Sequence, residues 1–150
     1  MTTVRRATVE DAPLVALLLD AFNREYDTAT PGPEALAARL RELLPAGDVV
    51  ALLARDLGLA LVTLRPNVWF AGPVGLLDEL YVAPGHRGQG IGAVLLTAAE
   101  QVVLDRGGEL LEVDVDDDGE GSRRFYERHG YRCTEPGSEH LTLRLSRDLA

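Results

Sequence analysis

A glycine-rich turn between a predicted strand and a predicted helix constrains the fold of this chain most strongly. Residues 76–82 read LLDELYV, an apolar strand pattern, and a turn with proline and glycine follows them. Apolar residues then recur at the spacing of one helix face: Ile91, Val94, Leu95, Ala98 and Val102. Gly88, Gly90 and Gly92 allow successive backbone N–H groups to converge where the helix dipole places partial positive charge. The segment therefore predicts a nest for a phosphate or pyrophosphate.

The remaining elements predict a mixed α/β fold in one domain over residues 1–150. The length fits one domain, and no repeat, linker or shift in composition divides the chain. Hydrophobic periodicity predicts helices over 9–23, 36–44, 91–106 and 121–129, and strands over 49–54, 58–64, 76–82, 109–115, 131–134 and 141–145. The strand, helix and strand from 76 to 115 form one right-handed crossover with a parallel pair. We therefore expect a central, mostly antiparallel sheet with one parallel strand pair, flanked by helices.

The charge balance disfavours a nucleic-acid partner. Lys and Arg total 15, all of them Arg, against 24 Asp and Glu, which gives a net charge of -9. A net-acidic surface repels a polyanionic backbone. Every apolar run is shorter than the ~20 residues of a membrane-spanning helix, and Glu10 and Asp11 stand where a signal peptide would have its apolar core. We expect a cytoplasmic protein that binds neither nucleic acid nor membrane.

The cysteine and the histidines predict no metal centre. The single cysteine, Cys133, cannot form an internal disulfide or half of a metal-binding cysteine pair. His86, His129 and His140 have no spacing suited to a shared ion. We therefore expect no metal cofactor, and we interpret Cys133 as a small core residue with no part in the chemistry.

A dinucleotide site is the main alternative interpretation of the turn. Gly88, Gly90 and Ala93 satisfy the pattern G-x-G-x-x-G/A, and Asp114 lies near the position of the acidic residue that contacts the ribose. A Rossmann domain, however, needs strands and helices that wind both ways from this motif. Here one strand–helix–strand unit is predicted between antiparallel hairpins, which disfavours that fold.

Two segments together resemble the GNAT superfamily of acyl-CoA-dependent N-acetyltransferases. The pyrophosphate signature of that family, Arg or Gln followed by x-x-Gly-x-Gly or Ala, is present as Arg87, Gly90 and Gly92 after a strand that ends in Leu-Tyr-Val. Residues 125–131, FYERHGY, match the element that these enzymes place beside the thioester, in the expected order and spacing. The resemblance implies the GNAT fold, acetyl-CoA as the cosubstrate, and transfer of its acetyl group to a primary amine by direct attack in a ternary complex.

The resemblance also implies which residues bind acetyl-CoA. The pyrophosphate would lie on the turn and the helix start, and strand amides would hold the pantetheine chain and polarise the thioester carbonyl. The candidate residues are Leu80, Tyr81, Val82, Arg87, Gly88, Gln89, Gly90, Ile91, Gly92 and Ser122. Ser122 is included because many members carry an Asn just ahead of the second segment. Its equivalent here is Gly119, so a nearby hydroxyl would have to replace that contact.

Three residues are candidates for catalysis. An alkyl amine has a pKa near ~10.4, so freeing its lone pair at pH 7 costs about 4.6 kcal/mol and a base is needed. Glu79 and Asp78 are the candidate bases, and strand alternation points them to opposite faces unless a bulge intervenes. We favour Glu79, as the family pattern implies. Tyr126 is the candidate acid that protonates the departing CoA sulfur, the alternative being a core aromatic beside Phe125.

The acceptor is the least constrained part of the prediction. Residues 116–120, DDDGE, form the densest run of charge, which is either a solvated turn or an attraction for a cationic amine at the carboxyl ends of the parallel strands. Small-molecule and peptide amines both fit, and a homodimer is left open. An alternative function is a non-catalytic acyl-CoA sensor or subunit. Retention of Tyr126, Glu79 and Asp78 favours the enzyme.

Overall fold

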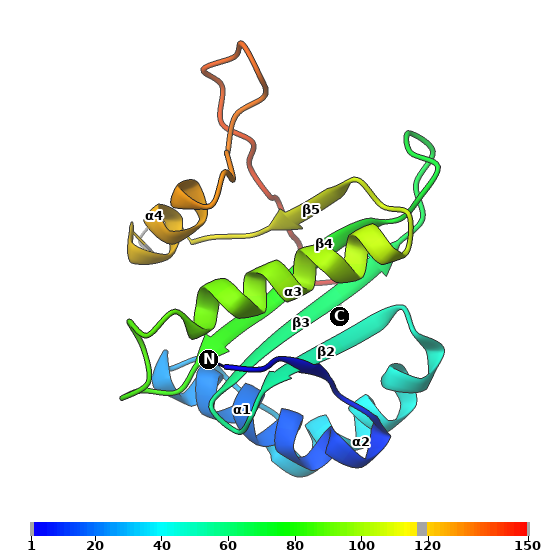
Figure 1. Cartoon of the computed structure of the whole chain (residues 1–150), viewed down its shortest axis with the longest axis vertical. Coiled ribbons are helices and arrows are strands. Elements are labelled where there is room, and N and C mark those ends of the chain that lie inside the picture. The colour runs from blue at the N-terminus through cyan, green and yellow to red at the C-terminus, as the bar shows by residue number, and fades with distance from the viewer. Residues whose placement is uncertain (1, 117–119, 150) are drawn as a thin grey trace. The chain divides into compact units, whose positions relative to one another are not determined.

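The computed structural model describes residues 2–116 and 120–149, and it divides into two compact units, Met1–Val113 and Asp114–Ala150. Figure 1 shows that the first unit holds the sheet with α1, α2 and α3, while the second holds α4 and the C-terminal segment. In the described part of the chain, no helix is both long enough and apolar enough to cross a membrane.

The first unit contains a mixed sheet with helices on both faces. Its elements, in chain order, are β1 (Arg5–Arg6), the 3-10 turn η1 (Val9–Asp11), α1 (Ala12–Glu25), α2 (Pro33–Leu43), the 3-10 turn η2 (Leu44–Ala46), β2 (Val49–Ala54), β3 (Gly58–Arg65), β4 (Val74–Val82), α3 (Ile91–Asp105) and β5 (Leu110–Val113). The strands lie in the order β1-β2-β3-β4-β5, and every neighbouring pair is antiparallel except β4 and β5. The predicted sheet, mostly antiparallel with one parallel pair, is confirmed.

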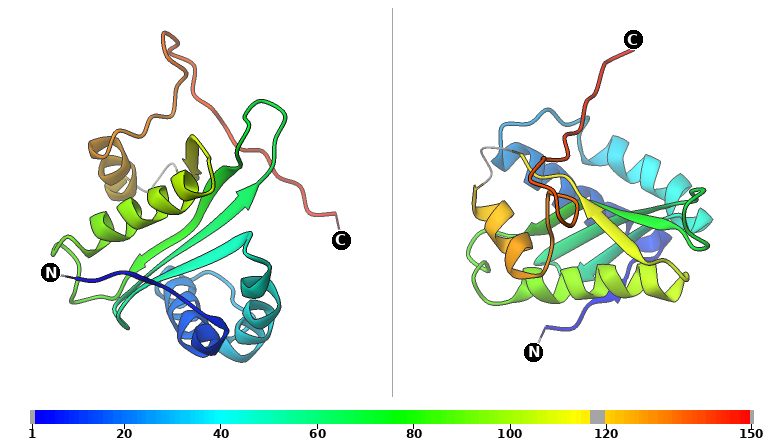
Figure 2. Two further views of the ribbon diagram at one scale, coloured as in Figure 1. Left: turned by 45° about the vertical axis from the view of Figure 1, so that its right-hand side comes forward. Right: turned by 90° about the horizontal axis from the view of Figure 1, so that it is seen from above.

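The sheet separates two helical layers, as Figure 2 shows. On one face, α1 and α2 bury a cluster that includes Val15, Leu40, Leu53, Leu59 and Tyr81. On the other face lies α3, which packs against β2, β3 and β4 and buries Leu95, Leu96, Ala99 and Val103. Each fully buried aliphatic side chain stabilises the fold by about 1.5–3 kcal/mol, so the two apolar faces of the sheet account for its sandwiched position.

The strand β4 is irregular in the middle. Its ladder with β3 pairs Leu61 with Glu79 and Val62 with Leu77, so Asp78 is one extra residue on β4 between two successive pairs. This two-against-one arrangement is a β-bulge, which bends the strand and increases its twist. The parallel ladder with β5 ends at the same place, with Leu77 opposite Val113. Beyond the bulge, β4 continues to Val82 with β3 as its partner.

The Asp11 side chain holds the start of the first helix. The Asp11 carboxylate accepts a hydrogen bond from the Thr8 backbone N–H at 2.8 Å and two from the Arg5 guanidinium at 2.7 Å. The helix predicted over 9–23 is a 3-10 turn followed by α1, which extends to Glu25. Tight 3-10 geometry is common where a helix begins.

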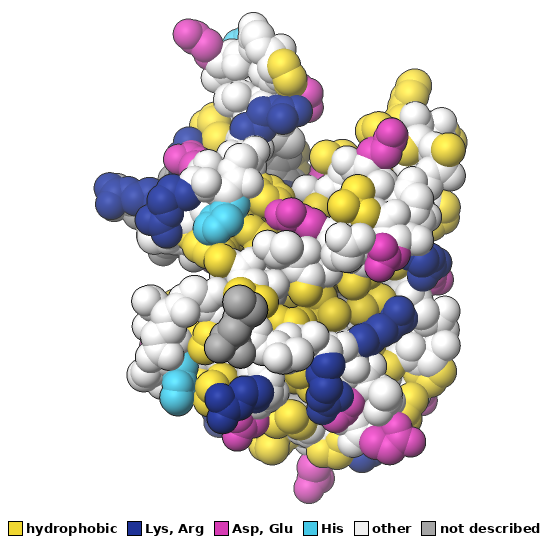
Figure 3. Space-filling view, in the orientation of Figure 1, with side chains coloured by type: hydrophobic (Ala, Val, Ile, Leu, Met, Phe, Trp, Pro, Cys, Tyr) yellow, Lys and Arg dark blue, Asp and Glu magenta, His cyan; other side chains and the backbone are white. Residues whose placement is uncertain are grey.

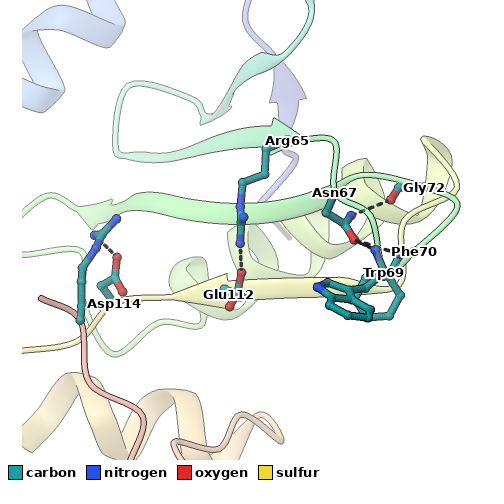
Figure 4. A network of polar contacts seen from close by, with 8 residues as sticks. Arg65, Asn67, Trp69, Phe70, Gly72, Glu112 and Asp114 are labelled. Carbon is teal, nitrogen blue, oxygen red and sulfur yellow. Dashed lines mark hydrogen bonds and ion pairs between the residues drawn. The ribbon is translucent and has the colours of Figure 1, made fainter.

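The loop between β3 and β4 is held by one asparagine. The Asn67 side-chain oxygen accepts hydrogen bonds from the backbone N–H groups of Trp69 and Phe70, both at 2.9 Å, and its Nδ2 donates to the Gly72 carbonyl at 3.2 Å (Figure 4). Beside this loop, Arg65 of β3 forms an ion pair of 2.8 Å with Glu112 of β5 across the intervening β4. The pair fastens the short fifth strand to the sheet.

The second unit contains α4 (Glu120–Arg128), close to the predicted helix over 121–129. The helix is followed by Gly130, whose φ of 90° is the left-handed conformation expected at a helix C-terminus. The predicted hairpin of 131–134 with 141–145 is wrong in extent. Within residues 120–149 the pairing is one isolated antiparallel bridge, Thr134 with Leu141, plus a 2.9 Å hydrogen bond from Thr142 N to the Cys133 carbonyl. An isolated two-stranded ribbon is marginally stable, and Pro136 in the connection limits it further.

Substitution of Gly75 tests how closely α3 packs on β4. A Cβ at this position would lie 2.4 Å from Val103 Cγ2 and 3.0 Å from Leu111 Cδ1. We expect Gly75→Ala to lower the free energy of unfolding by about 1–3 kcal/mol through overpacking, measured by urea denaturation. Adding Val103→Ala should recover part of the loss. Gly121→Ala, where a Cβ meets nothing within 4 Å, is the control and should be neutral or slightly stabilising. Equal stability of Gly75→Ala and the wild type would contradict the packing.

Candidate active site

The glycine-rich turn connects β4 to α3 and has the conformation of an anion nest. Gly85, Gly88 and Gly90 have φ values of 87°, 74° and 85°, which L side chains rarely adopt. The carbonyl of Gly90 accepts the hydrogen bond of Val94 N, so α3 begins directly after it and its first N–H groups have no partner within the helix. These donors, together with the helix dipole, can bind a phosphate. The residues predicted for the pyrophosphate thus lie together.

The edge of β4 that faces β5 is open beyond the bulge among the described residues of the first unit. The parallel ladder stops at Leu77, whereas Leu80, Tyr81 and Val82 continue to pair with β3 on the other side. Backbone N–H and C=O groups along such an edge can pair with an extended ligand as a further strand would. This is the geometry that the predicted pantetheine contacts require.

The bulge brings both candidate bases to the same face of β4. Glu79 lies opposite Leu61, which packs against the α1–α2 cluster, so its side chain is on that face. The Thr63 hydroxyl, two residues along β3 from Leu61 and therefore on the same face, donates a hydrogen bond to the Asp78 carboxylate. Without the extra residue, the two carboxylates would point to opposite faces.

The environment of Glu79 favours its neutral form. Its side chain is half-buried, and this burial raises the pKa of Glu79 because the charged form loses solvation. The negative charge of Asp78 raises the pKa of Glu79 further. A carboxylate with a raised pKa is a stronger base once ionised, which suits proton removal from an ammonium group.

Aromatic rings and one ion pair lie further along the same face of β4. Phe22 of α1 stacks on Tyr81 with ring centroids 5.1 Å apart, and Tyr26 contacts Phe22 edge-on at 5.3 Å. Arg87, predicted as a cation for the pyrophosphate, forms an ion pair of 2.7 Å with Glu25 at the end of α1. Its guanidinium also lies over the Tyr81 ring, 5.7 Å from the centroid. No local sequence pattern indicates the Glu25–Arg87 pair, because 62 positions separate the two residues.

Two predicted site residues belong to the second unit. Tyr126 of α4 is 9% exposed, and its ring contacts those of Phe125 at 5.2 Å and Tyr131 at 5.7 Å. Ser122 is on the exposed part of α4. Within this unit Tyr126 therefore has the packed surroundings of a core aromatic, and it also has the phenol that the catalytic hypothesis needs.

The acidic run is only partly described. Asp116 is exposed, whereas Asp117 and Asp118 lie outside the described residues together with Gly119. Just before the run, Asp114 forms an ion pair with Arg144 (Figure 4). The face of the molecule drawn in Figure 3 carries acidic and basic side chains interspersed, with apolar side chains between them. Among the residues that the structure describes, no group of three or more His, Cys, Asp or Glu side chains could hold a metal ion.

The chain matches the family model of the GNAT acetyltransferases over residues 16–131. The aminoalkylphosphonate N-acetyltransferase of Salmonella typhimurium is 31% identical over 137 residues, which cover 86% of this chain and 84% of that protein. The matched range spans both structural units and contains every predicted site residue.

Solved structures agree with the family match. A crystal structure from Arthrobacter sp. FB24, of a protein assigned as an acetyltransferase, is 48% identical with a TM-score of 0.94 and covers 99% of this chain and 97% of that one. The aminoglycoside N-acetyltransferase AAC(6')-Iy in complex with CoA is 18% identical with a TM-score of 0.80, covering 100% and 96%. This second likeness shows a shared fold.

The raised pKa of Glu79 predicts how stability depends on pH. The ionised carboxylate is less favourable in the folded state than in the unfolded state, so it lowers stability as the pH rises through the folded pKa. We expect Glu79→Gln to raise Tm at pH 7–8, on the order of 2 °C or less because the side chain is only half-buried, and to match the wild type below about pH 4. Glu42→Gln, at an exposed site on α2, is the control. A lower Tm of Glu79→Gln at pH 8 would show that the ionised carboxylate is stabilised by its surroundings.

Proposed function

The chain belongs to the GNAT family of acetyl-CoA-dependent N-acetyltransferases, and we propose that it transfers the acetyl group to a primary amine of a small-molecule or peptide acceptor by direct attack in a ternary complex. The observation that carries the proposal is the bulge in β4. It places Asp78 and Glu79 on one face of the strand, and beyond it β4 has an open edge that leads to the glycine-rich turn. Residues 1–150 then act as one catalytic domain made of both units.

Acetyl-CoA supplies the activated acetyl group and the thiolate leaving group, and the chain supplies the surfaces that bind it. The residues from Arg87 to Gly92 would hold the pyrophosphate through backbone N–H groups. The backbone of Leu80, Tyr81 and Val82 would hold the pantetheine chain, and one of these N–H groups would polarise the thioester carbonyl. Ser122 is a further candidate contact. The family match and the conformation of the turn support these assignments.

Glu79 would remove the proton from the amine. Its half-buried position and its charged neighbour raise its pKa toward the range in which a base works near neutral pH. Asp78 would act mainly by raising that pKa, and it remains the second candidate for the base. Tyr126 would donate a proton to the departing sulfur, since a thiolate with a pKa near ~8.5 leaves more readily when protonated.

The acceptor would be a cationic amine. The net charge of -9 attracts cations, and the proposed base lies beside a second carboxylate. The Salmonella relative is named for aminoalkylphosphonates and the AAC(6')-Iy enzyme for aminoglycosides, so amines of different kinds occur among the similar proteins. No particular amine follows from these names.

The direct test is turnover of acetyl-CoA, read as free thiol, against a panel of primary amines, together with thermal shifts. We expect thiol release that depends on the amine, and a rise in Tm with acetyl-CoA and with CoA that clearly exceeds the rise with NAD.

Gly90→Val should abolish the rise in Tm with CoA, because Val cannot readily adopt the φ of 85°. Stabilisation by acetyl-CoA without turnover of any amine would favour the non-catalytic sensor. Equal stabilisation by NAD would favour the dinucleotide interpretation.

The two carboxylates can be separated by the pH dependence of kcat/KM. Glu79→Gln should lower the rate by roughly 10² to 10⁴ and remove the acidic limb that belongs to the enzyme. Asp78→Asn removes the nearby charge that raises the pKa of Glu79, so the limb should move to lower pH while activity remains. The protonation of the amine contributes equally to every variant, so differences between variants report the enzyme. Asp56→Asn, at an exposed turn, is the matched control. The reverse result, with Asp78→Asn inactive and Glu79→Gln active, would assign the base to Asp78.

A further inference from the structure

Arg87 bridges the two helical layers of the first unit. It belongs to the turn that leads into α3, yet its Nε donates to the Val82 carbonyl at 2.8 Å and its Nη2 contacts both carboxylate oxygens of Glu25, at 2.8 and 2.7 Å. Glu25 ends α1, which lies on the opposite face of the sheet from α3. The side chain therefore passes across the end of β4 to a carboxylate in the other layer.

Glu25 and the rings around it form a site for a cation. The Arg87 guanidinium lies against the Glu25 carboxylate and over the Tyr81 ring. Phe22 stacks on Tyr81, and Tyr26 contacts Phe22. A carboxylate beside an aromatic face binds ammonium and guanidinium groups by ion pairing and cation–π attraction. In the structure the Arg87 guanidinium occupies this position, with the contacts that another cationic group would make.

The Tyr81 ring of this cation site lies on the same face of β4 as the proposed base, Glu79. Tyr81 and Glu79 are two residues apart on β4, so their side chains share the face covered by α1 and α2, about 7 Å apart along the strand. A linear diamine with one nitrogen at Glu79 could place its second nitrogen near Glu25. Such an acceptor would meet one carboxylate for reaction and another for binding.

We propose that Glu25 is a specificity-determining residue that binds a second cationic group of the acceptor, and that Arg87 masks it until acetyl-CoA binds. The proposal rests on the proposed function. The phosphates of acetyl-CoA on the adjacent turn compete with Glu25 for Arg87, whose side chain is 43% exposed and can be approached from solvent. Each phosphate contact weakens the hold of Arg87 on Glu25. Acetyl-CoA therefore favours binding of the cationic amine, and the amine favours binding of acetyl-CoA.

A matched pair of amines tests the role of Glu25 in turnover. The diamine 1,4-diaminobutane and the monoamine 1-aminobutane have the same reacting group and differ in the second cation. We expect the wild type to prefer the diamine. Glu25→Gln should reduce that preference at least tenfold by raising the KM for the diamine, while the KM for the monoamine stays within about twofold of the wild type. Asp27→Asn removes one charge two residues away, at a left-handed position that Asn tolerates, and should leave the preference unchanged.

The affinity for acetyl-CoA should change in the opposite direction. Removing the Glu25 charge leaves Arg87 unmasked, so Glu25→Gln should bind acetyl-CoA about 3- to 10-fold more tightly at low salt, and the difference should vanish near 1 M salt. A carboxylate that only fastens α1 to the turn gives another result: its loss would lower Tm and weaken the binding of acetyl-CoA and both amines together. That result would overturn the proposal.

Binding measured without turnover tests the masking itself. In calorimetric titrations with CoA, the wild type should bind 1,4-diaminobutane more tightly when CoA is present than when it is absent. Arg87→Gln exposes Glu25 permanently, so the diamine should then bind equally well with and without CoA. If CoA does not strengthen diamine binding to the wild type, or if Arg87→Gln loses diamine binding altogether, the masking fails. A wild type that binds the diamine with CoA but acetylates no amine would refute the proposed function and leave the cation site standing.

Discussion

The bulge at Asp78 is the constraint on which the rest of the site depends. One extra residue in β4 turns Asp78 toward the same face as Glu79, at the point where the parallel ladder with β5 stops at Leu77. Beyond the bulge, the edge of β4 that faces β5 is open among the described residues of the first unit, and the Asp78 charge adds to the burial that raises the pKa of the proposed base. In a regular strand, Asp78 and Glu79 would point to opposite faces. Just before the two strands part, the parallel ladder from Val74 to Leu77 holds β5 against β4, and the Arg65–Glu112 ion pair links β5 to β3 across β4.

Strand alternation beyond the bulge links the base to the first helix. Glu79 and Tyr81 face α1, and the stacked Phe22 ring fixes the position of Tyr81. The end of the same helix carries Glu25, which reaches Arg87 of the turn. The aromatic rings, Glu25 and the turn are therefore connected by direct contacts within one unit, and Glu79 lies two residues from Tyr81 on the same face of β4. A substitution at the end of α1 can therefore affect the glycine-rich turn through the Glu25–Arg87 ion pair.

The sequence predicted the features that depend on short-range patterns. The strand, turn and helix around the glycines, the mixed sheet and the helix over 121–129 follow from periodicity and from residues that favour particular backbone angles. The bulge could not be predicted, since it depends on how β3 and β4 pair across a loop. Strand alternation implied only that a bulge would be needed for Asp78 and Glu79 to share a face. The Glu25–Arg87 pair was missed because tertiary packing alone brings the two residues together. The hairpin of 131–134 with 141–145 was overpredicted, because alternation of apolar residues indicates a strand but not a partner sheet.

The charge of the chain acts in opposite directions on the two proposed substrates. A net charge of -9 attracts a cationic amine from a distance and repels the phosphates of acetyl-CoA. In the proposed site, affinity for the cofactor would then come from groups that act at contact distance, namely the backbone N–H groups of the turn and the start of α3. Their partial charges do not depend on the net charge of the surface. Arg87 is the one full positive charge that the motif adds to this turn, and in the structure Glu25 neutralises it. Under this proposal, the backbone conformation of the glycines contributes more than the neutralised Arg87 to the affinity of the free protein for phosphate.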